Sequence, residues 1–307
     1  MAEKRGGVIK VAQEASRKTS NSYRSSDGVK DHARGTDVSS EQMREARRDV
    51  DAAISVWRGV IEELLNDRVE YAILKGSASK PWDSPVDYVP VVSDLDIHMA
   101  TRCGGPLFPL SREGFLRSLE ATRIIEERFL ELRPRHIHIP RSQVVVMKEE
   151  HADWLPEAPG EVSALYGEVP LKPPEPTERL RARDLAELKS LGPLLDRLPE
   201  QVIDRIDLEY YRVLRMVCYV VSPSPVRVLS QMHPDPKHLW ALNRTGVIRE
   251  LKRYGFGELA DAYVDYYMAG WAAFTGGFRD NEAMRCLLAR AYTVLELSHR
   301  AVQEVSA

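Results

Sequence analysis

The sequence predicts an α+β protein in which a small mixed sheet is followed by an all-helical domain. Short strand-like runs alternate with helical patterns over residues 38–152, and helical periodicity then continues almost without interruption over residues 178–307. Six prolines between Pro156 and Pro176 separate the two patterns. We therefore expect two domains joined by a proline-rich linker at residues 153–177.

The composition fits a folded protein in a reducing compartment. The chain has 307 residues, of which 43% are hydrophobic, and a formal net charge of −3, so it is not a wholly disordered chain. It has no apolar run long enough to span a membrane, and its first residues lack the apolar stretch of a secretory signal. Its three cysteines are far apart and lack metal-type spacing. We expect a cytoplasmic protein with no membrane partner.

Residues 1–37 are rich in Ser, Gly, Lys and Arg and contain few large apolar side chains. Such a segment cannot bury enough apolar surface to offset the entropy cost of ordering it. This predicts a disordered, mildly basic tail. A nucleic-acid-binding arm is the alternative interpretation.

A long amphipathic helix is expected after the tail. Ser39 and Gln42 have the spacing of a capping box, and apolar residues then recur every three or four positions to about Leu65.

Strand signals follow this helix. Residues 71–74 form a short apolar run typical of a buried strand, and residues 94–99 alternate between polar and apolar side chains. A helix is expected at 111–132, and two short runs at 136–139 and 143–147 predict further strands. These elements favour a small mixed sheet.

The second half is expected to be helical, with prolines and glycines between its helices. The expected helices are 178–198, 200–221, 236–254, 257–274 and 280–305. Some of their side chains are interpreted as core, and the family resemblance described below implies a base or sugar pocket as the alternative: Tyr210, Tyr211, Arg212, Arg215, Asn243 and Arg244.

The residues that can carry chemistry gather around two neighbouring strands. Gly76 and Ser77 follow the first strand, and Asp94 and Asp96 lie two residues apart on the second. Residues two apart on a strand point to one face, so the two carboxylates would repel each other unless a cation joined them. Hard oxygen ligands favour Mg²⁺ or Mn²⁺, and a Gly-Ser turn lets the backbone approach a phosphate. These parts suit metal-assisted phosphoryl or nucleotidyl transfer.

Two runs carry a resemblance to a known family: Gly76-Ser77-Ala78-Ser79-Lys80-Pro81-Trp82 and Ser93-Asp94-Leu95-Asp96. They resemble the signature of the DNA polymerase β superfamily of nucleotidyltransferases, most closely the version in archaeal CCA-adding enzymes. The resemblance implies a nucleotidyltransferase domain at residues 38–152. It also implies catalytic and metal-binding roles for Asp94 and Asp96, and contacts from Gly76 and Ser77 to the β- and γ-phosphates of an NTP.

One part of the family pattern does not appear. These enzymes usually carry a third carboxylate on a later strand, where it commonly helps to deprotonate the attacking hydroxyl. Residues 133–147, where that strand is expected, contain no Asp or Glu. The departure affects catalysis and leaves nucleotide binding intact. The residues that could occupy the position or reach it are Gln143, His136, His138, Glu149 and Glu150.

Several neighbours of this constellation have two interpretations. Lys80 could hold a triphosphate as a point charge or could simply be solvated. Trp82 is interpreted as a packing residue and His98 as a hydrogen-bonded structural histidine; contacts to a nucleotide are the alternative for both. Three arginines flank the expected third strand and are candidates for phosphate contacts: Arg133, Arg135 and Arg141.

We expect an Mg²⁺-dependent, nucleotidyltransferase-like protein that transfers an NMP from an NTP to an acceptor hydroxyl. The acceptor could be an RNA, a small molecule or a protein. The alternative is a catalytically degenerate nucleotide-binding or regulatory protein on the same scaffold, and an interaction module is a third possibility.

Overall fold

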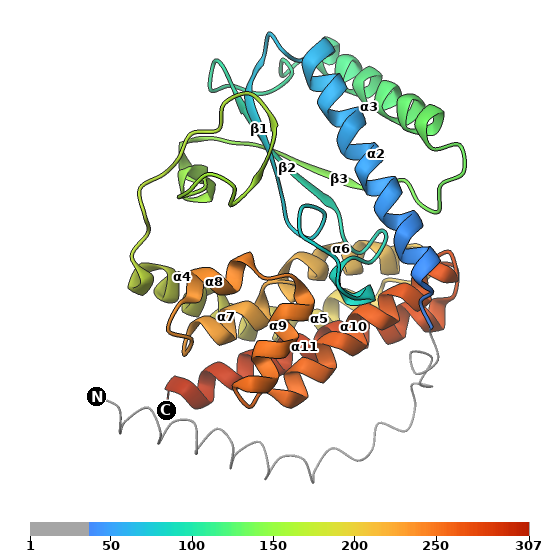
Figure 1. Ribbon diagram of the computed structural model, residues 1–307. Coiled ribbons are helices and arrows are strands. Elements are labelled where there is room, and N and C mark those ends of the chain that lie inside the picture. Colours follow the sequence, from blue (N-terminus) through green and yellow to red (C-terminus); the bar gives the residue numbers. More distant parts are fainter. Residues whose placement is uncertain (1–36, 307) are drawn as a thin grey trace. The chain divides into compact units, whose positions relative to one another are not determined.

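The computed structural model describes residues 37–306, with side chains as far as Gln303. These residues form two compact units (Figure 1). The sheet unit consists of Val38–Pro81 and Ser93–Pro174, and the helical unit consists of Trp82–Val92 and the chain from Glu175 onward. The expected tail lies outside the described residues except for Asp37.

Four strands form one mixed sheet in the order β3-β2-β1-β4. β1 is antiparallel to β2 and β4, whereas β2 and β3 are parallel. The protein is therefore an α+β fold with a small mixed sheet, as its alternating strand and helix patterns predict. The strands are β1 Val69–Lys75, β2 Leu95–Thr101, β3 Ser142–Val146 and β4 Ser163–Tyr166.

Two helices lie together on one side of the sheet (Figure 1). α2, Ser40–Leu64, begins at the expected capping box, in which Ser39 and Gln42 exchange side-chain and backbone hydrogen bonds. Trp57 of α2 donates from its indole nitrogen to the Ser142 hydroxyl of β3 at 2.7 Å. α3, Arg112–Leu132, packs beside α2.

The two faces of β2 differ in polarity. Leu95, Ile97 and Met99 are almost completely buried. The intervening positions carry Asp96 and His98, with Asp94 just before the strand. Because successive side chains alternate across a strand, these polar groups share the face opposite the buried apolar residues.

The expected strand at 136–139 is wrong, because these residues form no strand in the structure. The amides of Ile137 and His138 donate instead to the buried Asp49 carboxylate of α2, at 2.9 and 3.1 Å. The Asp49 side chain, 88 and 89 residues away in sequence, thus accepts hydrogen bonds from two amides that would pair with a neighbouring strand in a sheet.

The expected linker at 153–177 also contains regular structure. A 3₁₀ helix, η2, covers Glu149–Trp154, and β4 pairs with the edge of β1. After β4 the chain turns at Gly167, which has a φ of 68° and whose absent Cβ would lie 2.2 Å from the Glu70 carbonyl oxygen. Only glycine fits this close crossing, which ties the proline-rich segment to the sheet unit.

The helical unit contains more and shorter helices than the sequence predicts. The expected helix at 178–198 divides at Ser190, because Pro193 lacks the amide that would bond the Lys189 carbonyl. The expected helix at 236–254 divides where Asn243 caps a new helix by accepting from the Gly246 amide at 2.9 Å. The helices are α4 Thr177–Lys189, α5 Leu191–Ile203, α6 Glu209–Val221, α7 Ser224–Ser230, α8 Pro236–Ala241, α9 Arg244–Arg253, α10 Gly257–Thr275 and α11 Asn281–Ser306.

The loop at residues 82–92 belongs to the helical unit, which differs from the expected domain limits of 38–152. Its 3₁₀ turn, η1 Pro85–Asp87, ends in a carboxylate that is 2% exposed. This Asp87 carboxylate accepts from the amides of Asp83 and Ser84 at 2.8 and 3.0 Å, and from the amide and hydroxyl of Thr245 at 2.9 and 2.7 Å. The carboxylate therefore fixes both the shape of the loop and its attachment to α9.

Arg244 holds the same loop by its backbone. Its guanidinium donates to the carbonyl oxygens of Val86 and Asp87, at 3.0 and 3.1 Å, and lies 4.0 Å above the centre of the Tyr267 ring. Trp82 stacks on Tyr88 within the loop, with ring centres 4.5 Å apart. These contacts agree with the core and packing interpretations of Arg244 and Trp82.

Replacing Thr245 by valine is expected to lower the free energy of unfolding by about 1–3 kcal/mol, because a buried carboxylate loses a donor. Urea denaturation followed by circular dichroism measures this loss. The matched control is Thr293→Val on α11, where the hydroxyl donates only to the exposed carbonyl of its own helix and the expected change is within about 0.5 kcal/mol. Equal losses in the two variants would contradict the anchoring role.

None of the helices between residues 37 and 306 combines the length and apolarity needed to cross a bilayer. Cys103, Cys218 and Cys286 form no disulfide.

Candidate functional site

The Gly-Ser turn begins where β1 ends. Gly76 has a φ of 73°, a left-handed conformation that favours glycine. A Cβ at this position would lie 3.4 Å from the Asp96 Cβ and 3.7 Å from its Oδ2. The turn is therefore immediately beside one of the two carboxylates, and its exposed backbone is open to a ligand.

Arg47 of α2 holds the backbone of the turn by hydrogen bonds. Its Nη1 donates to the carbonyl oxygens of Ala78 and Lys80, at 3.4 and 3.2 Å. Within the turn, the Ser79 hydroxyl donates to the Gly76 carbonyl at 3.0 Å. Ser77 and Lys80 lie in this segment and are half-buried.

Asp94 and Asp96 are partly accessible, with 25% and 30% of their side-chain surface exposed. Asp94 Oδ2 accepts from Arg141 Nη2 at 2.8 Å. Asp96 Oδ1 lies 2.9 Å from His98 Nε2. The two carboxylates alternate with the buried Leu95, so they keep the common face that their spacing predicts.

Gln143, one of the residues considered for the third-carboxylate position, lies beside Asp96 on the neighbouring strand. The parallel register of β2 and β3 pairs Asp96 with Gln143, and Arg141 lies just before the same strand. Other side chains proposed for this position have different surroundings: His138 is buried against Asp49, and His136 bonds the Arg133 carbonyl oxygen. The described residues contain no group of three His, Cys, Asp or Glu side chains that could hold a metal ion.

The donor set still fits one hard cation. Mg²⁺ is usually held by one or two carboxylates, with substrate phosphates and water completing its octahedron. Asp94 and Asp96 supply two carboxylates, and Gln143 adds an amide oxygen on the neighbouring strand. The chemistry of this set favours Mg²⁺ or Mn²⁺ over softer metals.

Arg141 and His98 each carry a buried polar atom without an acceptor or donor among the described residues. These atoms are Nε and Nη1 of Arg141 and Nδ1 of His98. Buried polar groups are normally paired, and a buried guanidinium N–H without an acceptor is costly. A guanidinium with unused donors beside the carboxylates can serve an incoming phosphate.

Lys75, His151 and Trp154 extend the site, and sequence reasoning gave none of them a role. Lys75, whose Cα lies in register with Asp96 on β2, donates from its ammonium to the Trp154 carbonyl oxygen. The Trp154 ring lies between the rings of His98 and His151, with centres 4.9 and 4.5 Å away. The only sequence signal for this cluster was the position of Lys75 directly before Gly76.

Burial lowers the pKa of Lys75 to about 8, although the nearby Asp96 carboxylate opposes this shift. The folded pKa is below the unfolded one, so the protein is expected to gain stability as the pH rises from about 8 to 10.5, where the unfolded chain binds more protons. Replacing Lys75 by methionine should remove this gain. Urea midpoints at pH 7.5 and at pH 10 measure it, and the same pH dependence in both proteins would contradict the assignment.

Arg133 is part of a structural network. It donates to Asp49 Oδ1 at 2.8 Å and to a Glu45 oxygen at 2.6 Å. Arg135 is exposed. Of the three arginines considered for phosphate contacts, Arg141 is the one whose ion pair involves the Asp94–Asp96 pair.

Comparison with known proteins adds no relative, because no family model, no curated protein and no solved structure matches the chain.

Proposed function

We propose that the chain binds a nucleoside triphosphate together with Mg²⁺ at the Gly76-Ser77 turn and the Asp94–Asp96 pair. The observation that carries this proposal is how closely the turn approaches Asp96. A Cβ placed at Gly76 would lie 3.4 Å from the Asp96 Cβ. This approach supports a site in which a backbone that can approach a phosphate lies beside Asp96, one of the two carboxylates that could hold a cation. A bound cation would reduce the repulsion between the carboxylates and the phosphates.

The Asp94–Arg141 pair gives the site a way to accept its ligand. Without ligand, Asp94 and Arg141 neutralise each other at 2.8 Å. If Mg²⁺ and a triphosphate bind, Asp94 would exchange its guanidinium partner for the cation, and Arg141 would turn its donors to a phosphate oxygen. Ser77 donates from its hydroxyl or amide, and Lys80 adds a positive charge at the end of the turn.

Gln143, which lies in register with Asp96, favours nucleotide binding over nucleotidyl transfer as the function. In nucleotidyl transfer a base accepts the proton of the attacking hydroxyl. The Gln143 amide cannot accept that proton at neutral pH, whereas a carboxylate at the same register could. We therefore favour a nucleotide-binding or regulatory protein on a nucleotidyltransferase-like scaffold.

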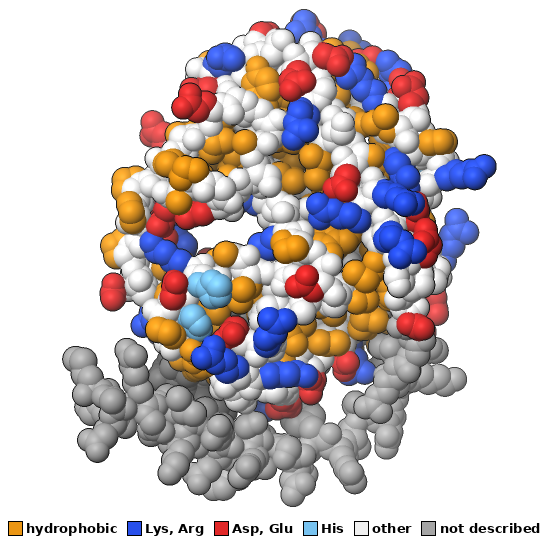
Figure 2. Space-filling view, viewed as in Figure 1, with side chains coloured by type: hydrophobic (Ala, Val, Ile, Leu, Met, Phe, Trp, Pro, Cys, Tyr) orange, Lys and Arg blue, Asp and Glu red, His pale blue; other side chains and the backbone are white. Residues whose placement is uncertain are grey.

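Transfer of an NMP is the second candidate, and His98 is the observation that favours it. Its Nε2 lies 2.9 Å from Asp96, and its Nδ1 has no partner in the described residues. A histidine held by a carboxylate can act as a general base. The acceptor would be a hydroxyl of an RNA, a small molecule or a protein. Figure 2 shows both basic and acidic side chains over the visible face, so no broad basic surface singles out RNA there.

Binding and transfer can be separated in one experiment. The protein is titrated with fluorescent NTP analogues in Mg²⁺ or in EDTA, and transfer of label from α-labelled NTPs to mixed acceptors is followed. Mg²⁺-dependent binding without label transfer is expected. Steady label transfer would favour the second candidate, and no binding of any NTP would refute both.

Replacing Gln143 by aspartate is expected to tighten Mn²⁺ binding about tenfold, because divalent-cation affinity rises with the number of charged ligands. Electron paramagnetic resonance of free Mn²⁺ measures the change. The control is Gln143→Asn, which keeps a neutral amide and should bind Mn²⁺ like the wild type. Unchanged affinity in Gln143→Asp would show that this position does not face the cation.

A further inference from the structure

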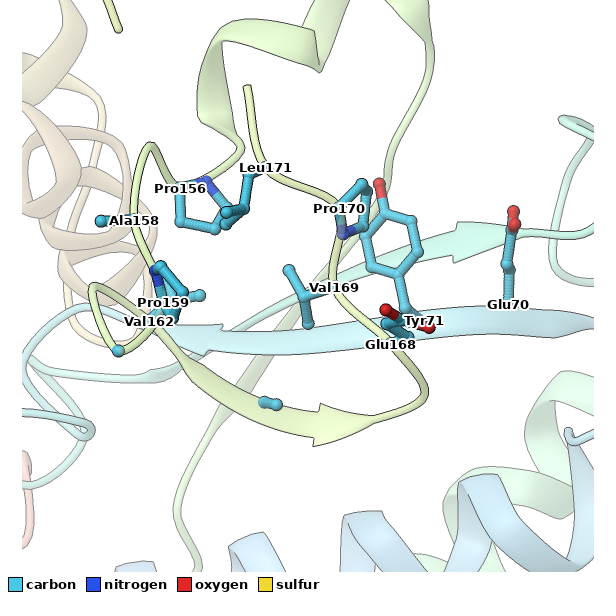
Figure 3. Close-up of a pocket in the computed structure, with 12 residues that line it drawn as sticks. Glu70, Tyr71, Pro156, Ala158, Pro159, Val162, Glu168, Val169, Pro170 and Leu171 are labelled. Carbon is cyan, nitrogen blue, oxygen red and sulfur yellow. The ribbon is translucent and has the colours of Figure 1, made fainter. Parts of the chain in front are cut away.

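A pocket lies at the end of β1 opposite the Gly76 turn (Figure 3). Its volume is about 700 Å³, a size that suits a small organic ligand. Its walls come from the start of β1, from β4 and from the proline-rich segment on either side of β4. All of these residues belong to the sheet unit.

The pocket is distinct from the Asp94–Asp96 site. None of the twelve lining residues is a residue of the Gly76 turn or of β2. Tyr71 lies four residues before Lys75, which is about 13 Å along the strand. A ligand in this pocket would therefore not need the nucleotide site.

The lining combines apolar walls with acidic groups. Pro156, Val162 and Val169 contribute to the walls, and Glu70 and Glu168 are the charged residues of the lining. The twelve lining residues include no Lys, Arg or His. Neither glutamate has an ion-pair partner among the described residues. The charge of the pocket is therefore complementary to a cation.

The Tyr71 hydroxyl adds a polar group that the fold does not use. Tyr71 is 8% exposed, and its ring packs with Ile73 and Met147. Its hydroxyl has no hydrogen-bond partner in the part of the chain that the structure describes. Burial and the Glu70 carboxylate raise the pKa of Tyr71, so the hydroxyl stays protonated at neutral pH. In Figure 3 the side chain rises from β1 on the side where Val169 and Pro170 lie.

We propose that this pocket binds a small organic cation that carries an apolar or aromatic body and one protonated amine. The apolar body packs against the proline and valine walls, where it is removed from water. The ammonium pairs with the Glu168 carboxylate at the rim, and the Tyr71 hydroxyl hydrogen-bonds a polar atom of the ligand. An anion of the same shape would meet two unpaired carboxylates and is excluded.

A matched series of fluorescent probes tests the charge preference. Dansylcadaverine carries an aromatic body and a primary amine, dansyl-6-aminohexanoate replaces the amine by a carboxylate, and dansyl-butylamide is neutral. We expect saturable binding of the amine at about 10–100 μM, with a blue-shifted emission, and at least about tenfold weaker binding of the carboxylate probe. Equal binding of the two charged probes, or no saturable binding of the amine, overturns the proposal.

Three variants locate the bound probe. Val162→Trp fills the pocket and should abolish amine binding. Glu168→Gln removes one charge and should weaken amine binding about tenfold, while leaving the neutral probe unchanged. Glu126→Gln, an exposed change on α3, is the control and should have no effect.

Glu168 is exposed, so its variant tests the proposal even if Val162→Trp does not fold. Unchanged amine binding in Glu168→Gln, or in a folded Val162→Trp protein, overturns the assignment. The Asp94→Asn/Asp96→Asn protein should bind the amine normally, so failure of the nucleotide proposal is distinguishable from failure of this one.

Discussion

Replacing Asp49 by alanine is expected to lower the free energy of unfolding of the sheet unit by about 3–5 kcal/mol, the cost of breaking a buried ion pair. Asp49 is completely buried in the middle of α2. Its Oδ1 accepts from Arg133 at 2.8 Å, and its Oδ2 accepts from the amides of Ile137 and His138. The variant leaves one donor of Arg133 and the two amides without their acceptor, and each is costly to bury unpaired.

Acid should remove the same contribution. Burial alone would raise the pKa of Asp49, but hydrogen bonds from His138, Arg133 and the two amides outweigh it and lower the pKa below its ordinary value of 3.8. Because the folded pKa is the lower one, the stabilisation is present above the unfolded pKa and is lost as the pH falls through the folded pKa. Asp49→Asn should therefore lose less stability than the wild type between pH 5 and pH 2.

Urea denaturation of the full chain measures both effects. Glu62→Ala, an exposed change on the same helix, is the control and should alter the free energy of unfolding by no more than about 0.5 kcal/mol. A loss below about 1 kcal/mol in Asp49→Ala would contradict the role of Asp49 as the anchor of residues 137 and 138.

The Asp94→Asn/Asp96→Asn double variant is expected to weaken Mg²⁺-dependent NTP binding by about 100-fold or more. Removing a residue that only hydrogen-bonds a metal ligand already costs about 10- to 100-fold in metal affinity. This variant removes the charge of both proposed ligands. Asparagine keeps the shape of each side chain, so the fold should survive. Titration with a fluorescent NTP analogue measures the affinity.

Two comparisons make this result specific. Asp67→Asn, an exposed change in the same unit, should bind like the wild type. In EDTA the double variant should bind the analogue no more weakly than the wild type, because Arg141 then has no carboxylate competing for its donors. Affinity within about threefold of the wild type in Mg²⁺ would refute the assignment of Asp94 and Asp96.

Features that depend on neighbours in sequence could be predicted. The start of α2 follows from the Ser39–Gln42 capping box, and the common face of Asp94 and Asp96 follows from strand alternation. The Gly76 turn also lies where the end of an apolar strand predicts it. Each of these signals spans only a few residues, so the sequence alone contains it.

Features that depend on distant partners could not be predicted. Residues 136–139 have strand-like alternation, but Asp49 takes two of their amides. The loop at 82–92 reads as part of the first domain, but Asp87 and Arg244 join it to α9 across 157 or 158 residues. β4 was not predicted because it lies among prolines. The proximity of Lys75 and Trp154 was not predicted either.

Calorimetric titration tests the proposed nucleotide site most directly. The wild-type chain is titrated with α,β-methylene analogues of the four NTPs, in excess Mg²⁺ and in EDTA. These analogues cannot be cleaved at the bond that transfer would break, so the heat reports binding alone. We expect saturable binding of at least one analogue in Mg²⁺ and loss of that binding in EDTA. No binding in Mg²⁺, or equal binding in EDTA, would contradict the proposed site.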